Sequence, residues 1–117
     1  MVSSVRITSA VARVLAALLD DPSADRYGLD LIRATGLPSG TLYPILIRLQ
    51  RAEWLTAHWE EIDPVAEGRP ARRYYRMTPD GTALARTELA RLYQQLSRVD
   101  GIGGAAGGAA HATGVIA

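Results

Sequence analysis

Residues Thr35 to Leu49 read TGLPSGTLYPILIRL, and this stretch decides the fold of the chain. Its second half carries apolar residues at i, i+3, i+4 and i+7, which predicts one buried helix face. These residues are Leu42, Ile45, Leu46 and Leu49. The helix is expected to begin at Ser39, a good N-cap, and to end near Ala52. Pro44 lacks the N–H that would bond the Gly40 carbonyl, so either the first turn is slightly kinked or the helix begins later.

The opposite face of this helix combines small residues, a tyrosine, a proline and two arginines, with no acid among them. It consists of Ser39, Gly40, Thr41, Tyr43, Pro44, Arg48 and Arg51. Small residues let the backbone approach a phosphate or a base edge, and the positive end of the helix favours phosphate. Thr41 or Pro44 suits a thymine methyl group, whereas Arg48 and Arg51 are placed to reach phosphates. This face is typical of a helix that enters the major groove of DNA.

Two shorter helices are expected before this one. The first runs from Ser9 to about Leu19, with Thr8 or Ser9 as its cap. Its apolar stripe is Ile7, Val11, Val14, Leu15 and Leu18. The second runs from about Tyr27 to Thr35, and its inward residues are expected to be Leu29, Ile32 and also Leu31. Gly36 then ends this helix as a left-handed residue. Two short helices joined by a tight turn with glycine indicate a helix-turn-helix.

After this unit the hydrophobic period changes from helical to alternating. Leu55, Ala57 and Trp59 alternate with polar residues, which predicts a strand. The segment 63–70, DPVAEGRP, is rich in turn residues, and 72–77, RRYYRM, reads as the returning strand, with Tyr74 or Tyr75 in the core. The hairpin has the size of a wing, and the fold class is mainly α (α+β), a winged helix-turn-helix domain.

A further helix begins at Pro79 with Thr78 as its cap. Its apolar residues repeat with the 4, 3, 4, 3 spacing of a coiled-coil seam, and they are Ala85, Leu89, Leu92, Leu96 and Val99. We favour packing against a partner helix over packing inside the domain. Residues 101–117 are Gly/Ala-rich and are expected to be flexible. The predicted organisation is a DNA-binding domain over 1–77, a C-terminal dimerisation helix over 78–100 and a tail over 101–117.

Composition excludes several classes of protein. The 117 residues include no cysteine, so neither disulfides nor thiolate metal sites are expected. Apolar runs are too short to cross a bilayer, and the N-terminus lacks the order of a signal peptide, so a cytoplasmic protein with no membrane partner is expected. The only histidines, His58 and His111, lie in the hairpin and the tail, and no phosphate-binding loop motif occurs. We therefore expect no enzyme, no metal and no cofactor.

Two pieces of the chain resemble the PadR-like transcriptional regulators. They are YGLDLIRATGLPSGTLYPILIRLQRAEWL and GRPARRYYRMTPDGTAL, within a match over about residues 11–96. The chain departs from the family at Gln50, where an acid is common, and at Glu53, where a glycine is common. The resemblance implies a winged helix-turn-helix that dimerises through its C-terminal helix with help from the first helix. It also implies that Tyr43 and its neighbours touch DNA, and that a small hydrophobic or phenolic effector binds near the dimer interface.

The wing completes the expected DNA interface. The resemblance implies that its tip, Gly68-Arg69-Pro70, reaches the adjacent minor groove or the DNA backbone, and a flexible tip bearing arginine suits a narrow, electronegative minor groove. Arg72, Arg73 and Arg76 are expected to divide between phosphates and the solvated face. The predicted function is a sequence-specific, homodimeric regulator, a repressor, that reads a pseudo-palindromic operator in double-stranded DNA with the helix starting at Ser39 and the wing at Asp63–Arg72. Predicted dimer contacts are Val11, Val14, Leu18, Ala85, Leu89, Leu92, Leu96 and Val99. The alternative is a winged-helix interaction module that acts through its C-terminal helix without binding DNA.

Overall fold

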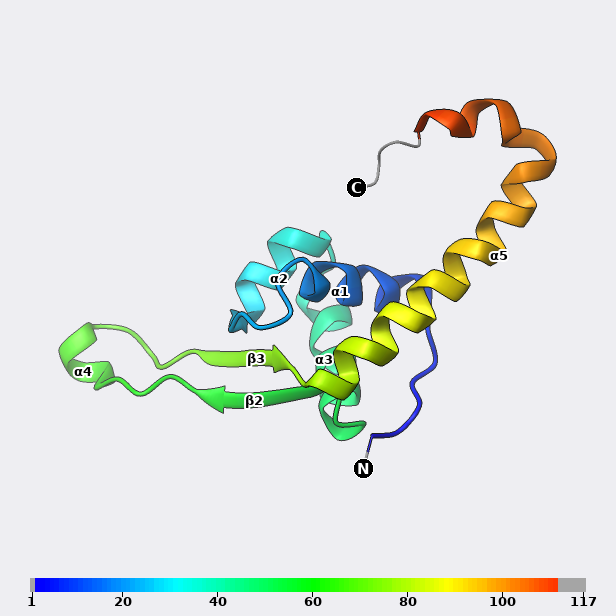
Figure 1. Cartoon of the computed structure of the whole chain (residues 1–117). Coiled ribbons are helices and arrows are strands. Elements are labelled where there is room, and N and C mark those ends of the chain that lie inside the picture. The colour runs from blue at the N-terminus through cyan, green and yellow to red at the C-terminus, as the bar shows by residue number, and fades with distance from the viewer. Residues whose placement is uncertain (1, 112–117) are drawn as a thin grey trace. The chain divides into compact units, whose positions relative to one another are not determined.

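A computed structural model describes residues 2–111 of the chain, with side chains described for residues 2–98. The elements follow in the order α1 (Ser9–Leu19), β1 (Arg26–Tyr27), α2 (Gly28–Thr35), α3 (Ser39–Arg51), β2 (Leu55–Trp59), α4 (Pro64–Glu67), β3 (Arg73–Met77) and α5 (Pro79–His111). Figure 1 shows them along the chain. The chain forms two compact units, one through Arg86 and one from Thr87 onward. The first turns of α5 therefore belong to the first unit.

The helices α1, α2 and α3 pack together and hold the core of the first unit. Their apolar stripes are buried as the spacing predicted: Val11, Val14, Leu15 and Leu18 from α1, and Leu42, Ile45, Leu46 and Leu49 from α3. Trp54 also lies in this core, and its indole N–H donates to the Ser3 carbonyl at 2.6 Å. The predicted cap of α1 is confirmed, because the Thr8 hydroxyl accepts from the Val11 N–H at 3.2 Å.

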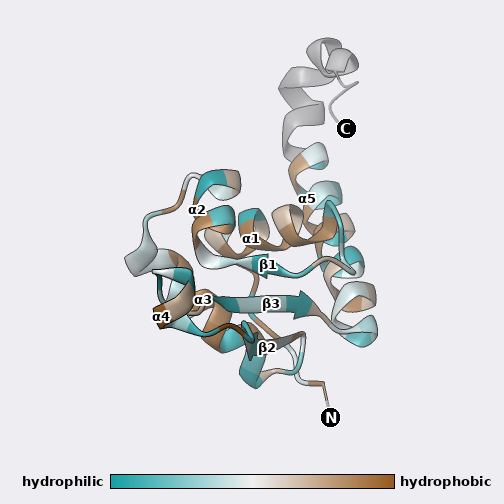
Figure 2. Ribbon diagram, turned by 90° about the vertical axis from the view of Figure 1, so that its left-hand side faces the viewer, coloured by the Kyte–Doolittle hydropathy of each residue, from teal (hydrophilic) through white to brown (hydrophobic). Residues whose placement is uncertain are grey.

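The sheet has three antiparallel strands in the order β1-β3-β2, which Figure 2 shows side by side. The predicted hairpin is confirmed, with Leu55 opposite Met77 at one end and Trp59 opposite Arg73 at the other. Of the two tyrosines on β3, Tyr75 is the buried one. The strand β1 was not predicted. It has only two residues, too few to show an alternating pattern, and pairing with β3 alone defines it.

The inward side of α2 agrees with the prediction at Leu31 and differs from it at Leu29. Leu31 is fully buried, whereas Leu29 is 47% exposed and Ile32 is half-buried. Because α2 starts at Gly28, its buried row consists of Gly28 and Leu31, three residues apart. The end of the helix is as predicted, since Gly36 takes the left-handed conformation with φ of 73°.

The start of α3 also needs a correction. Pro38, not Ser39, is the N-cap residue, and its carbonyl accepts from the Thr41 and Leu42 N–H groups at 3.0 and 2.9 Å. Ser39 is the first helical residue, so its hydroxyl does not cap the helix. Pro44 lies inside α3, which excludes a later start.

At the far end of α3, Glu53 takes the left-handed conformation with φ of 65°. The Trp54 N–H reaches the Leu49 carbonyl at 2.9 Å and the Glu53 N–H reaches the Gln50 carbonyl at 3.0 Å, as in a Schellman motif. A glutamate therefore stands where the backbone favours glycine.

Helix α5 starts as predicted, with the Thr78 hydroxyl accepting from the Gly81 N–H at 2.9 Å. Gly81 is buried against the Trp54 backbone, where a side chain would not fit. The prediction that the helix stops before Gly101 is wrong, because its backbone stays helical to His111. Alanine is the best helix former and no proline interrupts residues 101–111, so the glycines there weaken the helix without ending it. Residues 112–117 of the predicted tail lie outside the described residues.

Candidate nucleic-acid interface

Every residue predicted on the outer face of α3 is exposed. They are Ser39, Gly40, Thr41, Tyr43, Pro44, Arg48 and Arg51. The core face of the same helix is almost completely buried, so the two faces are sharply separated. Because α3 contains no acid, nothing on this face repels a phosphate.

Sequence reasoning missed one residue of this face. Ile47 is 47% exposed and lies three residues after Pro44 and four after Tyr43, on the outward side of α3. An exposed isoleucine next to a proline suits contact with a thymine methyl group. The sequence did carry a signal for this residue. Ile47 lies outside the i, i+3, i+4, i+7 set that forms the core face, so a large apolar side chain is left on the outer side of the helix.

A notch of about 240 Å³ adjoins the start of α3. It is lined by Tyr27, Gly28, Leu29, Tyr43, Arg72 and Arg73. The guanidinium of Arg72 lies over the Tyr27 ring at 4.8 Å, and that of Arg73 lies over the Trp59 ring at 5.0 Å. Such stacking restrains a long side chain without neutralising it. The lining contains two cations and no carboxylate, so it favours an anion.

The third arginine of the returning segment, Arg76 on β3, has a different environment. Arg76 is exposed, and its Nε donates to Asp25 at 3.0 Å, so it is paired within the domain. Arg72 and Arg73 therefore remain the candidates of the wing base for phosphate contact.

Arg69, the arginine of the predicted wing tip, is paired within the chain. The Arg69 guanidinium makes two hydrogen bonds to the Glu60 carboxylate, at 2.7 and 3.0 Å. Glu60 also accepts from the Arg72 backbone N–H at 3.2 Å. These contacts, led by the Arg69 hydrogen bonds, lower the pKa of Glu60 from its ordinary 4.5 to about 2, and raise the pKa of Arg69. Arg69 thus braces the two strands where the wing begins.

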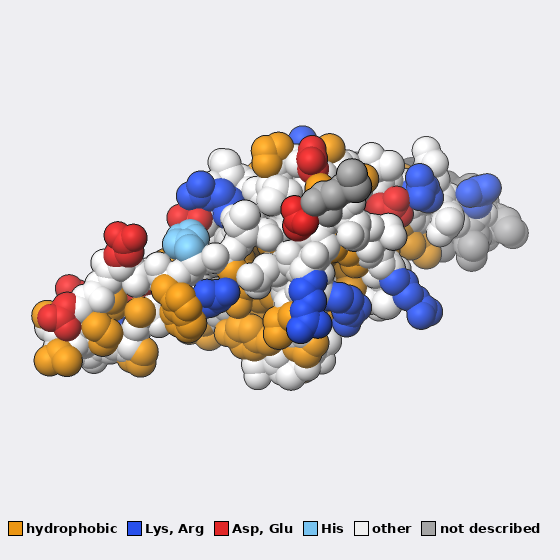
Figure 3. All heavy atoms as spheres, turned by 90° about the horizontal axis from the view of Figure 1, so that it is seen from below, with side chains coloured by type: hydrophobic (Ala, Val, Ile, Leu, Met, Phe, Trp, Pro, Cys, Tyr) orange, Lys and Arg blue, Asp and Glu red, His pale blue; other side chains and the backbone are white. Residues whose placement is uncertain are grey.

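Beyond this brace the wing is acidic and apolar. Its turn forms the short helix α4, capped by the Asp63 carboxylate on the Val65 N–H at 3.1 Å and ended by left-handed Gly68. Val65 is 90% exposed, and Glu61, Asp63 and Glu67 are exposed around it. In Figure 3 the far left end, where the wing lies, carries acidic and hydrophobic side chains and no Lys or Arg in view. This tip is a poor match for a phosphate backbone.

The predicted dimer contacts fall into two groups. Val11, Val14, Leu18 and Ala85 are 0–1% exposed within the chain itself, so the prediction that they form an interface is wrong. The core of the first unit already uses these four side chains. Leu89 and Leu92 are half-buried and Leu96 is 54% exposed, so these three have surface left for a partner. The side chain of Val99 lies outside the described residues.

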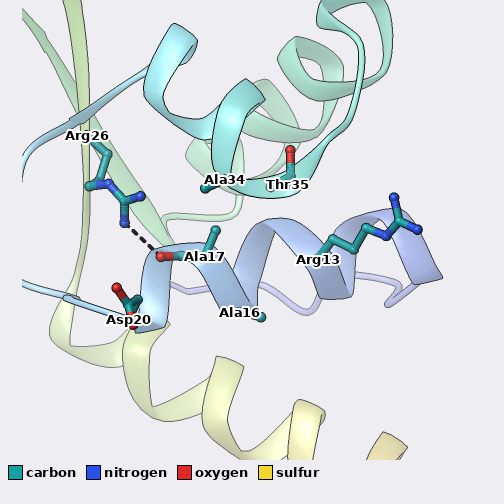
Figure 4. A pocket seen from close by; sticks show the side chains of 7 residues that line it. All are labelled: Arg13, Ala16, Ala17, Asp20, Arg26, Ala34 and Thr35. Atoms are coloured by element: carbon teal, nitrogen blue, oxygen red, sulfur yellow. Dashed lines mark hydrogen bonds between the residues drawn. The ribbon is translucent and has the colours of Figure 1, made fainter. Parts of the chain in front are cut away.

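A second groove, of about 450 Å³, lies between α1 and α2 (Figure 4). Three alanines and Thr35 line it together with Arg13, Asp20 and Arg26. Arg26 is already held, because it donates to the Ala17 carbonyl at 2.7 Å and to Asp30 at 2.5 Å. None of the predicted DNA contacts lines this groove. Over the part of the chain that the structure describes, no acidic or histidine side chains gather as a metal site, and no helix is long and apolar enough to span a membrane.

A helix-turn-helix followed by a β-hairpin, with an exposed acid-free face on its second helix, defines a winged helix-turn-helix DNA-binding protein. The sequence model of the transcriptional regulator PadR-like family matches residues 14–87, and the chain belongs to this family. Its members are transcriptional regulators rather than enzymes, so the chain is a DNA-binding transcriptional regulator.

Solved structures agree with this assignment. BpsR of Bordetella bronchiseptica, whose DNA binding is regulated by 6-hydroxynicotinic acid, is 25% identical, with a TM-score of 0.65 over 85% of this chain and 64% of that one. This chain therefore spans less than two thirds of BpsR. The protein smu.1704 of Streptococcus mutans is 26% identical, with a TM-score of 0.63 over 86% of this chain and 92% of that one. A PadR-like transcription factor of Bacteroides fragilis, 24% identical with a TM-score of 0.60 over 80% of this chain and 88% of that one, shares the fold. No curated protein matches the sequence.

Proposed function

We propose that the protein is a homodimeric repressor that reads a pseudo-palindromic operator with the outer face of α3. The observation that carries this proposal is the exposure of all seven predicted residues on a helix face without acids. Hydroxyls and small residues at its start suit base edges, and Arg48 and Arg51 near its end suit phosphates. Bound to a promoter, such a dimer represses by occupying the site where polymerase must bind.

The wing takes a smaller part in this proposal than the sequence indicated. Arg72 and Arg73 at its base are the cations that lie beside the start of α3, in the lining of the notch that includes Tyr43. The tip beyond the Arg69–Glu60 brace is acidic, so it stays away from the phosphates. The wing thus contributes backbone contacts from its base, and α3 supplies the base contacts.

Dimerisation is supported by the leucines of α5. Leu89, Leu92 and Leu96 continue the 3 and 4 spacing of a coiled-coil seam and keep exposed surface. A two-fold dimer would place two α3 helices on half-sites about one turn of DNA apart, roughly 10 base pairs. Light scattering on the purified chain tests this directly, and a Leu92→Glu, Leu96→Glu variant is expected to be monomeric.

The central experiment selects genomic fragments bound by the full chain and then measures anisotropy on the selected duplex and on a shuffled duplex. We expect binding about a thousandfold tighter on the selected site, the lower end of the usual range of specificity. Equal affinity for both duplexes would contradict the proposal that the protein recognises a specific sequence. Failure to bind either duplex even at low salt would favour the alternative, a winged-helix module that acts on protein partners.

We further propose that a small hydrophobic or phenolic molecule controls DNA binding. The support is the similarity to BpsR, whose DNA binding responds to 6-hydroxynicotinic acid. The test is a thermal-shift screen with small aromatic acids and phenols, followed by anisotropy of the protein–operator complex. A compound that raises the melting temperature and releases the operator supports the proposal, and a compound that stabilises the protein without changing DNA affinity argues against it.

A further inference from the structure

Gly28 is the first residue of α2, and it is buried against the ring of Tyr43 from α3. The nearest atom to a Cβ built at this position is the Tyr43 hydroxyl oxygen, followed by Cζ at 2.6 Å and Cε1 at 2.8 Å, all closer than real Cβ atoms come. Only a hydrogen atom therefore fits between the Gly28 backbone and Tyr43 as it stands.

The backbone of Gly28 does not itself call for glycine. The glycines with left-handed backbones in the described structure are Gly36 and Gly68, and Gly28 is not among them. An ordinary residue fits the helical backbone at position 28, and alanine is a better helix former than glycine. The contact with Tyr43 is the feature that requires glycine at this place.

The direction of the tyrosine follows from its position in α3. Long side chains on a helix lean toward its N-terminus, so the Tyr43 ring lies over the start of α3 and reaches the first turn of α2. Tyr43 as a whole residue is 38% exposed. One part is thus packed against the other helix of the helix-turn-helix, and the rest is open on the acid-free face.

We propose that Gly28 is a positioning residue for sequence recognition: the bare backbone at the start of α2 is a seat that fixes the Tyr43 ring in the orientation in which α3 presents it to DNA. This inference rests on the proposed function, because it assigns Tyr43 a contact with the operator. A ring already held in place loses little rotamer freedom on binding, which favours both affinity and a single mode of contact.

The seat also links the two helices at the site of recognition. Tyr43 and Gly28 both line the notch that Arg72 and Arg73 complete. A methyl group at position 28 moves the free end of a flexible side chain, so the fold accommodates it and the ring is displaced. The consequence is altered recognition in a protein that remains folded.

The experiment is a double-mutant cycle of Gly28→Ala and Tyr43→Ala on the selected operator. We expect Gly28→Ala alone to weaken operator binding about tenfold, the size of one lost base contact. In the Tyr43→Ala background, Gly28→Ala should change affinity by less than about twofold, because the clash is gone. An equal loss of operator affinity in both backgrounds would overturn the proposal that Gly28 acts by positioning Tyr43.

A nuclear Overhauser effect between the Tyr43 ring and the Gly28 Hα tests the seat without DNA. It should be present in the parent protein, and in a folded Gly28→Ala variant the ring should show no such effect with the Hα that remains at residue 28; its absence from the parent overturns the inference. Gly40→Ala is the matched control, because a Cβ there meets no atom within 4 Å, so the effect should persist. If Tyr43→Ala binds the operator normally, Tyr43 does not contact DNA. The nuclear Overhauser effect still shows in that case whether Gly28 positions the ring.

The double-mutant cycle also tests the proposal if the Gly28→Ala variant fails to fold. If Gly28→Ala unfolds, adding Tyr43→Ala should restore folding, because it removes the obstructing ring. A double variant that stays unfolded would overturn the inference.

Discussion

The outer face of α3 and the tip of the wing are both exposed, yet they differ in charge and in how their arginines are held. The α3 face has Arg48 and Arg51 and no acid, whereas the segment of the wing from Glu61 to Glu67 has three acids and no cation. The arginine that follows, Arg69, is bonded to Glu60. Exposure and nearby arginine residues are therefore insufficient evidence of a DNA contact. What decides is whether the cation is still available.

The largest effect is expected from removing the charges of α3. An Arg48→Ala, Arg51→Ala double variant should bind DNA about tenfold to a hundredfold more weakly, because charged hydrogen bonds to phosphates are lost. The slope of log affinity against log salt should fall by about 1.8, or 0.9 for each contact. Anisotropy titrations at several salt concentrations measure both quantities.

The matched change in the wing is Glu61→Gln with Glu67→Gln. This change removes two negative charges from the tip, whereas the α3 variant removes two positive charges. We expect affinity to change by less than about twofold, because the proposed interface uses the base of the wing and not its tip, and charges farther than a Debye length from the phosphates are screened. A large gain in DNA affinity would mean that the wing tip approaches DNA. The tip and the outer face of α3 would then not differ in their contact with DNA.

A smaller effect is expected for apolar contacts. Ile47→Ser should weaken operator binding about fivefold and remove a thymine preference at one position of the selected site, if this side chain meets a thymine methyl. Val65→Ser makes a similar change at a more exposed residue of the wing tip and should leave both unchanged. A selected-site profile that is identical for parent and Ile47→Ser would exclude the assignment of Ile47.

The arginines of the wing provide the next test. Arg72→Ala should lower the salt slope by about 0.9, since the Arg72 guanidinium stacks on Tyr27 and keeps its charge for a phosphate. Arg69→Ala should leave the slope unchanged, because its charge is already paired with Glu60. If the two variants behave in the opposite way, the wing tip rather than its base contacts DNA.

Much of this contrast was predictable, and the part that was not has a physical reason. The spacing of Leu42, Ile45 and Leu46 fixes which side of α3 faces outward, so the exposed face followed from the sequence. The Arg69–Glu60 pair joins residues nine apart across a hairpin, and no local pattern shows whether an arginine meets a carboxylate there. The burial of Val11 also required the tertiary structure, because an apolar stripe serves a core and an interface equally well.

The Arg69–Glu60 pair is expected to make the stability of the fold depend on pH. The pKa of Glu60 is lowered from 4.5 to about 2 in the folded protein, chiefly by Arg69, so the unfolded chain takes up this proton first. The pair therefore stabilises the fold fully above about pH 4.5 and loses that contribution as the pH falls toward 2. Urea unfolding from pH 6 down should show a steeper loss of stability for the parent than for Glu60→Gln. Parallel curves for the two proteins would show that the brace does not affect stability.

The smallest effects concern two left-handed residues, one in each region. Glu53 ends α3 with φ of 65°, and Gly68 ends α4 with φ of 69°. The same left-handed conformation is thus occupied once by glutamate, which disfavours it, and once by glycine, which adopts it easily. A side chain in this conformation costs roughly 1–2 kcal/mol, partly offset by the greater freedom of glycine in the unfolded chain. Glu53→Gly should therefore raise the free energy of unfolding by about 1 kcal/mol, and Gly68→Ala should lower it by a similar amount. Urea denaturation measures both, and neither change should alter the salt slope of DNA binding. A loss of stability in Glu53→Gly would show that the contacts of the Glu53 side chain outweigh the backbone cost, and that the end of α3 is held differently from the turn of the wing.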